Sequence, residues 1–331
     1  MHSGGASAKI ETLHAASLVI EPNPKPSAQW LWLLLSLIAP LYYGLVSLSH
    51  SLVEFRVQDD ARLHVVWLQQ FWDSGLFPQD LFAEYYRAIQ GVGFQGVYWL
   101  LAQFGVEPLL LAKLLPTGLA VLTTMFLFRF TLALVPYPAC GFWTTLFLNQ
   151  NIWLKDDLIS ATPRAFAYPL LMMFLDCLVR SSDWGLLILV AITGLVYPQL
   201  VLVELGLILL RYPRRGLLLA AALGTAAATI LPFRQGVTQA FGSLFTEAQM
   251  QQMPEFGPGG RREYFGVDPL SFWLRGASGL RFPLFPPILW ASLALPWIPS
   301  STHPNFAPLR RLLAELLLVS LGLFLLAHLL F

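Results

Sequence analysis

The sequence predicts an all-α protein, a polytopic bundle of transmembrane helices with several short or broken helices and further helices at the outer interface. Hydrophobic residues make up 56% of the 331 residues, charged residues only 12%, and the mean hydropathy is +0.62. Long apolar runs recur, and several can cross a hydrocarbon core of about 30 Å. Because backbone groups in lipid must bond to one another, such runs are helical.

The N-terminal segment and the net charge further restrict the class of membrane protein. Residues 1–29 are polar and contain lysines at positions 9 and 25, which predicts a cytoplasmic tail ahead of one transmembrane domain over 30–331. No apolar core followed by a small-residue cleavage site precedes that domain, which argues against a removed signal peptide. The net charge of +1 argues against a nucleic-acid partner.

The first half of the chain sets the topology. A first crossing is expected over 30–53, followed by an outer loop at 54–92 that carries six acids against three arginines. The run 93–135, interrupted by prolines, predicts a short apolar helix and one full crossing back, ending in a tight turn. A short outward crossing at 140–149, an outer loop at 150–164 and a return through 165–179 follow.

The apolar stretch 184–210 has two interpretations. One long helix would place Arg211, Arg214 and Arg215 outside, against the positive-inside rule. Broken at Tyr197–Pro198, the stretch becomes two helices of roughly 20 Å each, with these arginines back in the cytoplasm. We favour the break, because proline lacks a backbone donor and disrupts the preceding turn.

The remaining chain predicts an outward crossing at 216–231, a large outer loop at 232–281, an inward crossing at 283–298 and an outward one at 312–331. The total is nine or more spans. The chain stops inside an apolar run, so we expect a truncated C-terminus. This topology brings two acidic pairs, Asp59–Asp60 and Asp156–Asp157, to one face together with the break at 197–199 and the Pro/Gly/Arg-rich loop 254–262.

Five segments carry a resemblance to a known superfamily. Arg-Val-Gln-Asp-Asp-Ala-Arg-Leu-His (56–64), Leu-Phe-Pro-Gln-Asp (76–80) and the pair Tyr85–Tyr86 resemble the first outer loop of the GT-C superfamily of polytopic glycosyltransferases. Asp-Asp-Leu-Ile-Ser-Ala-Thr-Pro-Arg-Ala-Phe (156–166) and Met-Pro-Glu-Phe-Gly-Pro-Gly-Gly-Arg (253–261) resemble segments of GT-C-like bacterial membrane proteins, cyanobacterial ones included. The resemblance spans about 30–290. It implies sugar transfer from a polyprenyl-phosphate donor on the periplasmic or extracellular face of a bacterial cytoplasmic membrane.

Such a transfer needs a general base, and the resemblance places it at Asp59 or Asp60 without separating them. Adjacent carboxylates raise one another's proton affinity, and desolvation at a membrane edge adds to this, so one of them suits the task near neutral pH. The alternative is that both cap a helix starting near Ala61.

His64 follows Asp60 by one helical turn, so both side chains would share a face. Together with Asp157 they would make an oxygen-rich Mg²⁺ or Mn²⁺ site. The alternative is an ordinary surface or core histidine, because no second histidine or cysteine pair completes the set.

Substrate contacts are expected from further polar residues. Arg164, Arg261 and Arg262 would bind the lipid phosphate, because guanidinium matches phosphate bidentately; alternatively they snorkel to the headgroups or are solvated. The remaining substrate-binding candidates are Asp156, Asp157, Gln199 and Glu255.

Two other classes of function remain open. Asp176 and Glu204 lie inside apolar runs and would fit a transporter or lipid-handling protein, although no internal repeat is present. A non-catalytic membrane scaffold is the other alternative. Membrane lipids are partners in every case.

Overall fold

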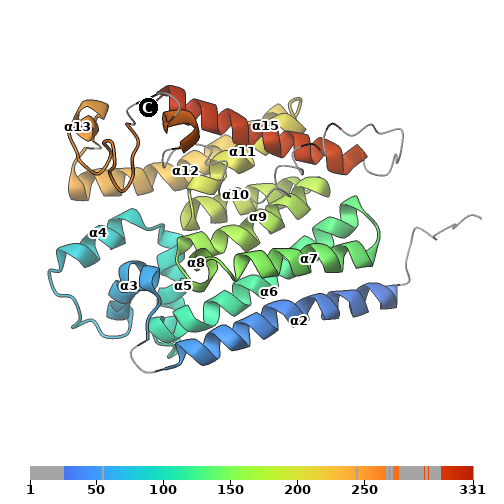
Figure 1. The fold of residues 1–331 in the computed structure, drawn as a ribbon, viewed down its shortest axis with the longest axis horizontal. Helices are drawn as coiled ribbons and strands as arrows, with labels where there is room; N and C mark the ends of the chain where they lie inside the picture. Colours follow the sequence, from blue (N-terminus) through green and yellow to red (C-terminus); the bar gives the residue numbers. More distant parts are fainter. Residues whose placement is uncertain are drawn as a thin grey trace, which may run out of the picture.

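The computed structural model describes residues 26–53, 56–243, 245–265, 268, 271–275, 294, 297 and 307–330, and within these residues the chain is helical and contains no strand. The long helices run side by side along the long axis of the molecule (Figure 1). Four helices among the described residues are long and apolar enough to cross a membrane. They are α2 (Pro26–Ser51), α6 (Pro108–Leu134), α12 (Gly216–Phe241) and α15 (Ala307–Leu330).

Five shorter helices complete the body of the bundle and have between 12 and 17 residues each. A straight crossing needs about 20 residues, so these helices are too short to be counted as full spans by length alone. An all-helical architecture with four candidate membrane-spanning helices is therefore confirmed for the described residues, whereas nine spans remain a prediction. The five are α5 (Val92–Gln103), α7 (Pro138–Ile152), α9 (Pro163–Val179), α10 (Asp183–Val196) and α11 (Gln199–Arg211).

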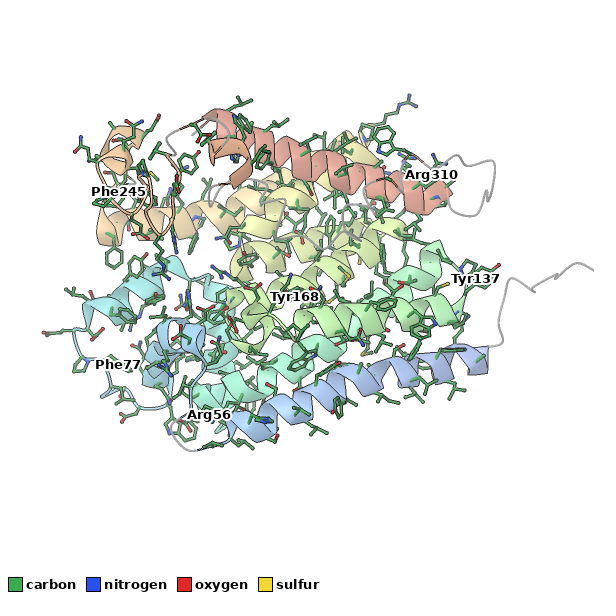
Figure 2. All side chains as sticks on the ribbon, in the orientation of Figure 1. Arg56, Phe77, Tyr137, Tyr168, Phe245 and Arg310 are labelled. Carbon is green, nitrogen blue, oxygen red and sulfur yellow. The ribbon has the colours of Figure 1, made fainter. Side chains whose placement is uncertain are left out.

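The smallest helices gather at one end of the bundle. Helices α3, α4 and α13 lie together at the left of Figure 1, whereas Tyr137 and Arg310 mark the opposite end (Figure 2). These short helices lie within the segments that the sequence predicts as outer loops or beside them, and their place at a membrane interface remains a prediction. They are α3 (Asp59–His64), η1 (Val66–Phe71), α4 (Leu81–Ile89), α8 (Asp156–Ile159) and α13 (Glu247–Gln251), and a single π turn, η2, covers Ser271–Arg275.

The break between α10 and α11 is present as predicted. Helix α10 ends at Val196, and α11 begins at Gln199, so the chain reverses around Tyr197–Pro198. At the far ends of the two helices, the Arg215 guanidinium binds the Asp183 carboxylate at 2.6 Å. The basic segment 211–215 therefore returns to the start of α10, as the positive-inside rule requires.

Two boundaries differ from the sequence prediction. Helix α2 begins at Pro26, inside the expected tail 1–29. Helix α12 passes through Pro232 and continues to Phe241, so the outer loop expected from 232 starts later. The added turns pack against α4, where the Phe241 and Tyr85 rings meet edge-on at 5.4 Å, and this packing outweighs the hydrogen bond that proline cannot donate. The expected crossing at 283–298 lies almost wholly outside the described residues.

Candidate functional site

A cavity of about 220 Å³ opens where α3, the start of α9 and the α10–α11 break meet. It combines a carboxylate, an imidazole, a guanidinium and two carboxamides, all brought together from separate segments. Its lining consists of Asp60, His64, Ile89, Gln90, Gly91, Thr162, Pro163, Arg164, Val196, Tyr197, Pro198, Gln199 and Phe233.

The geometry of α3 separates the two adjacent acids. The side-chain oxygen of Gln58 accepts a hydrogen bond from the Ala61 amide at 2.9 Å, so Gln58 is the N-cap. The alternative that the two aspartates cap this helix is therefore wrong, although both lie in its favourable first turn. Asp60 is half-buried and lines the cavity, whereas Asp59 is exposed and does not.

His64 lies one turn from Asp60 on the same face, as expected. The Gln90 amide nitrogen donates to the His64 carbonyl oxygen at 2.9 Å and lies 3.1 Å from Nδ1 of the ring. Because the His64 carbonyl oxygen can only accept, the group that faces it must be the NH₂ of the Gln90 side chain. That NH₂ also faces Nδ1 of the His64 ring, so Nδ1 is the acceptor. The ring is then neutral and carries its proton on Nε2. Burial lowers the pKa of His64; the carboxylate of Asp60 opposes this and the charge of Arg164 adds to it.

The lowered pKa of His64 predicts a pH dependence. The unfolded chain takes up the proton near 6.5 and the folded chain only at lower pH, so stability is complete above about pH 6.5 and decreases as the pH falls below it. We expect the wild type to lose more thermal stability than His64→Gln between about pH 7.5 and 5.5. Parallel unfolding temperatures for the two proteins over this range would contradict the assignment.

Arg164 reaches the cavity from the first turn of α9. The helix starts after Thr162 with Pro163 in its first position, where a missing amide hydrogen costs nothing. The Asp157 carboxylate lies 3.6 Å from Nη1 of Arg164, and the Tyr168 hydroxyl lies 3.5 Å from the same carboxyl group. Asp157 does not line the cavity itself, so its contact is with the arginine that does.

The turn ahead of α9 is strained. Ala161 has a φ of 51°, in the left-handed region that residues with a Cβ avoid. Its carbonyl accepts a hydrogen bond from the buried Tyr98 hydroxyl at 2.9 Å, and the Ser160 and Thr162 hydroxyls lie 3.0 Å apart. These contacts hold the turn that places Arg164, and such strain is concentrated at functional sites.

Gly91 allows the segment before α5 to approach the end of α10, on the side of the cavity formed by the α10–α11 break. A Cβ at this position would lie 2.2 Å from the Leu195 carbonyl oxygen, so only glycine permits this approach to the end of α10. The close contact sets Gln90 beside the α10–α11 break. Gln199, at the start of α11, lines the same cavity, as the sequence predicted for a substrate contact.

Several predicted site residues lie elsewhere. Asp59 and Asp156 are exposed and do not line the cavity. In the loop after α13, Arg262 lies 3.8 Å from the Glu255 carboxylate, and its amide donates to the Glu255 carbonyl at 3.0 Å. This internal pairing closes the loop on itself, and Glu255, Arg261 and Arg262 are exposed.

The expected metal set is not assembled. Asp60 and His64 line the cavity, whereas Asp157 binds Arg164 outside the lining. Among the described residues, no three His, Cys, Asp or Glu side chains lie close enough together to hold a metal ion. The polar groups of the cavity therefore do not fit the expected Mg²⁺ or Mn²⁺ site.

Sequence analysis missed Gln90, whose side chain is buried and fixes the histidine. Its amide oxygen is buried without a hydrogen-bond partner among the described residues. The signal was present as a Gln-Gly pair directly ahead of the apolar run of α5, a position where a buried carboxamide is unexpected. Thr162 and Phe233 were missed as well, because nothing in the sequence relates them to α3.

Comparison with known proteins finds no matching family model, no matching curated protein and no matching solved structure.

Proposed function

We propose that the protein is a GT-C-like glycosyltransferase that moves a sugar from a polyprenyl-phosphate donor to an acceptor hydroxyl at the outer membrane face. The observation that carries the proposal is that Asp60 and Arg164 line one cavity, at the end of the bundle where the outer-loop helices gather. One supplies a base and the other a fixed positive charge, which are the two groups that such a transfer requires.

Each group has a defined task in the reaction. The Asp60 carboxylate takes the proton of the acceptor hydroxyl as its oxygen forms a bond to the anomeric carbon. The bond from that carbon to the phosphate oxygen breaks, and the electron pair leaves with the polyprenyl phosphate. Arg164 binds the phosphate as its negative charge grows, and Asp157 holds the guanidinium in place.

The neutral residues suit a sugar. Gln199 lines the cavity and offers hydrogen bonds to sugar hydroxyls. At about 220 Å³ the cavity is smaller than the pockets of about 300–1,000 Å³ that enclose drug-sized ligands. It suits a sugar and its phosphate, while the polyprenyl chain stays in the lipid.

Retention of the leaving group tests the proposal. In native mass spectrometry of the detergent-purified protein, we expect bound polyprenyl phosphate in the wild type. We expect Arg164→Gln to lose it and Arg262→Gln to keep it, because Arg262 is an exposed loop residue outside the cavity. Equal retention by both variants, or only bulk phospholipid on folded wild type, would contradict the role of Arg164.

The buried acids Asp176 and Glu204 are the residues on which the alternative function, a transporter, depends. Asp176 is bound by Arg129 at 3.1 Å and by Arg180 at 2.8 Å, so it is a structural ion pair. Glu204 is fully buried, and one carboxyl oxygen accepts a hydrogen bond from Thr193 at 2.9 Å. Glu315 is likewise paired, with Arg211 and Arg311, so among the described residues Glu204 is the one buried carboxyl group without a cation, whereas an ion pathway needs a series of such groups.

Glu204→Gln separates the two functions. The amide has the same shape and keeps an oxygen for the Thr193 hydroxyl, so we expect sugar transfer within about twofold of the wild type. A proton-coupled transporter would lose its transport with this substitution. Loss of transport in a Glu204→Gln variant with unchanged thermal stability would favour the transporter.

A further inference from the structure

A second cavity, of about 270 Å³, lies between the end of α2, the start of α3 and the outer part of α6. Helix α3 and its cap contribute to both cavities: Gln58 and Ala61 line this one, whereas Asp60 and His64 line the candidate site. The other lining residues are Ser47, His50, Ser51, Arg56, Val57, Leu109, Ala112, Lys113, Pro116 and Ile159.

The described residues that line this cavity carry charges of one sign. They include Lys113, Arg56 and an imidazole, His50, and none of the described lining residues is an aspartate or glutamate. The aliphatic part of the wall comes from the residue before Gln58, from α3, α6 and α8, whereas α2 adds two serines. A cavity with cations at one side and an apolar wall complements an anionic amphiphile.

Lys113 is the least expected of these residues. It lies five residues into α6, a candidate membrane-spanning helix, which places it about 7.5 Å below the start of that helix. Its half-buried side chain forms no hydrogen bond or ion pair with any described residue. By contrast, Arg129 and Arg211 bind buried acids in neighbouring helices. A cation inside a span is costly, and an anion in the adjacent cavity would offset that cost.

Arg56 supports the same conclusion from the membrane surface. One of its terminal nitrogens donates to the His50 carbonyl at 2.9 Å, which anchors the side chain while other guanidinium donors stay available. Arg56 lies at the end of the bundle that carries α3 and α4 (Figure 2). Phosphate held between Arg56 and Lys113 would sit at the headgroup level of the outer leaflet.

We propose that this cavity binds the phosphate headgroup of an anionic membrane lipid. Lys113 and Arg56 bind the phosphate, and the aliphatic wall contacts the first carbons of the acyl chains. The site is separate from the sugar-transfer cavity and does not rest on the proposed function. Because Gln58 caps α3, a lipid bound here would also stabilise the helix that presents Asp60.

Lipid titration tests the site. The purified full chain in detergent is titrated with phosphatidylglycerol or phosphatidylcholine, and bound lipid is counted by native mass spectrometry. We expect phosphatidylglycerol to bind Lys113→Met about fivefold more weakly than the wild type, which is the effect of one cation near an anionic headgroup. Lys155→Met is the matched control, because it removes an exposed lysine outside the cavity.

Two further measurements complete the test of the proposed lipid site. Arg56→Gln alters an exposed side chain. If Lys113→Met fails to fold, phosphatidylglycerol binding by Arg56→Gln tests the proposed site instead. Competition between inorganic phosphate and phosphatidylglycerol for the wild type would show that the phosphate group itself is recognised. Free phosphate would then be the alternative source of the bound phosphate. Equal phosphatidylglycerol binding by the wild type and the two cavity variants, or an equal loss in Lys155→Met, would overturn the proposal.

Discussion

Asp60→Asn is expected to lower the rate of sugar transfer by about 10²–10⁴-fold, the usual contribution of a general base. The amide has the same shape but cannot accept the acceptor's proton. The helix should remain intact, because its N-cap is Gln58 and not the aspartate. The measurement is the initial rate of polyprenyl-phosphate release in proteoliposomes, with the unfolding temperature recorded beside it.

Asp59→Asn is the matched control for this prediction. Asp59 has the same charge and lies in the same helical turn, but it is exposed and outside the cavity. We expect its rate to stay within a few-fold of the wild type, because Asp59 is exposed and does not line the cavity. A large loss in Asp59→Asn together with full activity in Asp60→Asn would contradict the assignment.

Gly91→Ala is expected to give the largest structural effect. The added methyl group would lie 2.2 Å from the Leu195 carbonyl oxygen, and a backbone atom cannot move aside by a rotamer change. Overpacking of this kind costs about 1–3 kcal/mol. It would also displace Gln90 from His64, so thermal stability and activity should fall together.

Gly96→Ala provides the control within the same helix. Nothing lies within 4 Å of a Cβ built at Gly96, and alanine favours a helix over glycine by about 1 kcal/mol. We expect this variant to be as stable as the wild type or more so. If Gly91→Ala were equally harmless, the close approach of α5 to α10 would not shape the cavity.

Much of the fold was predictable because membrane physics is restrictive. The positive-inside rule placed the arginines at 211–215 on the same side as the start of α10, and this expectation predicted the break at Tyr197–Pro198 that the structure contains. The same logic failed at Pro232. There, packing of the added turns against α4 keeps α12 helical, and the local sequence carries no sign of that contact.

The candidate site was predictable only in part. Helical spacing placed Asp60 and His64 on one face, and the helix break pointed to Gln199. Separating Asp60 from Asp59 required the knowledge that Gln58 is the cap. The pairing of Glu255 with Arg262 is a loop contact that follows no helical spacing, so it could not be predicted and the loop was not excluded from the site.

The most direct test is release of polyprenyl phosphate by the wild-type protein. Purified protein in proteoliposomes would receive polyprenyl phosphates that carry hexoses, pentoses or amino sugars, with native membrane lipids as the source of acceptors. We predict release of free polyprenyl phosphate from at least one donor, with the sugar recovered on an acceptor. Folded protein that retains these donors without releasing polyprenyl phosphate from any of them would contradict the proposed function.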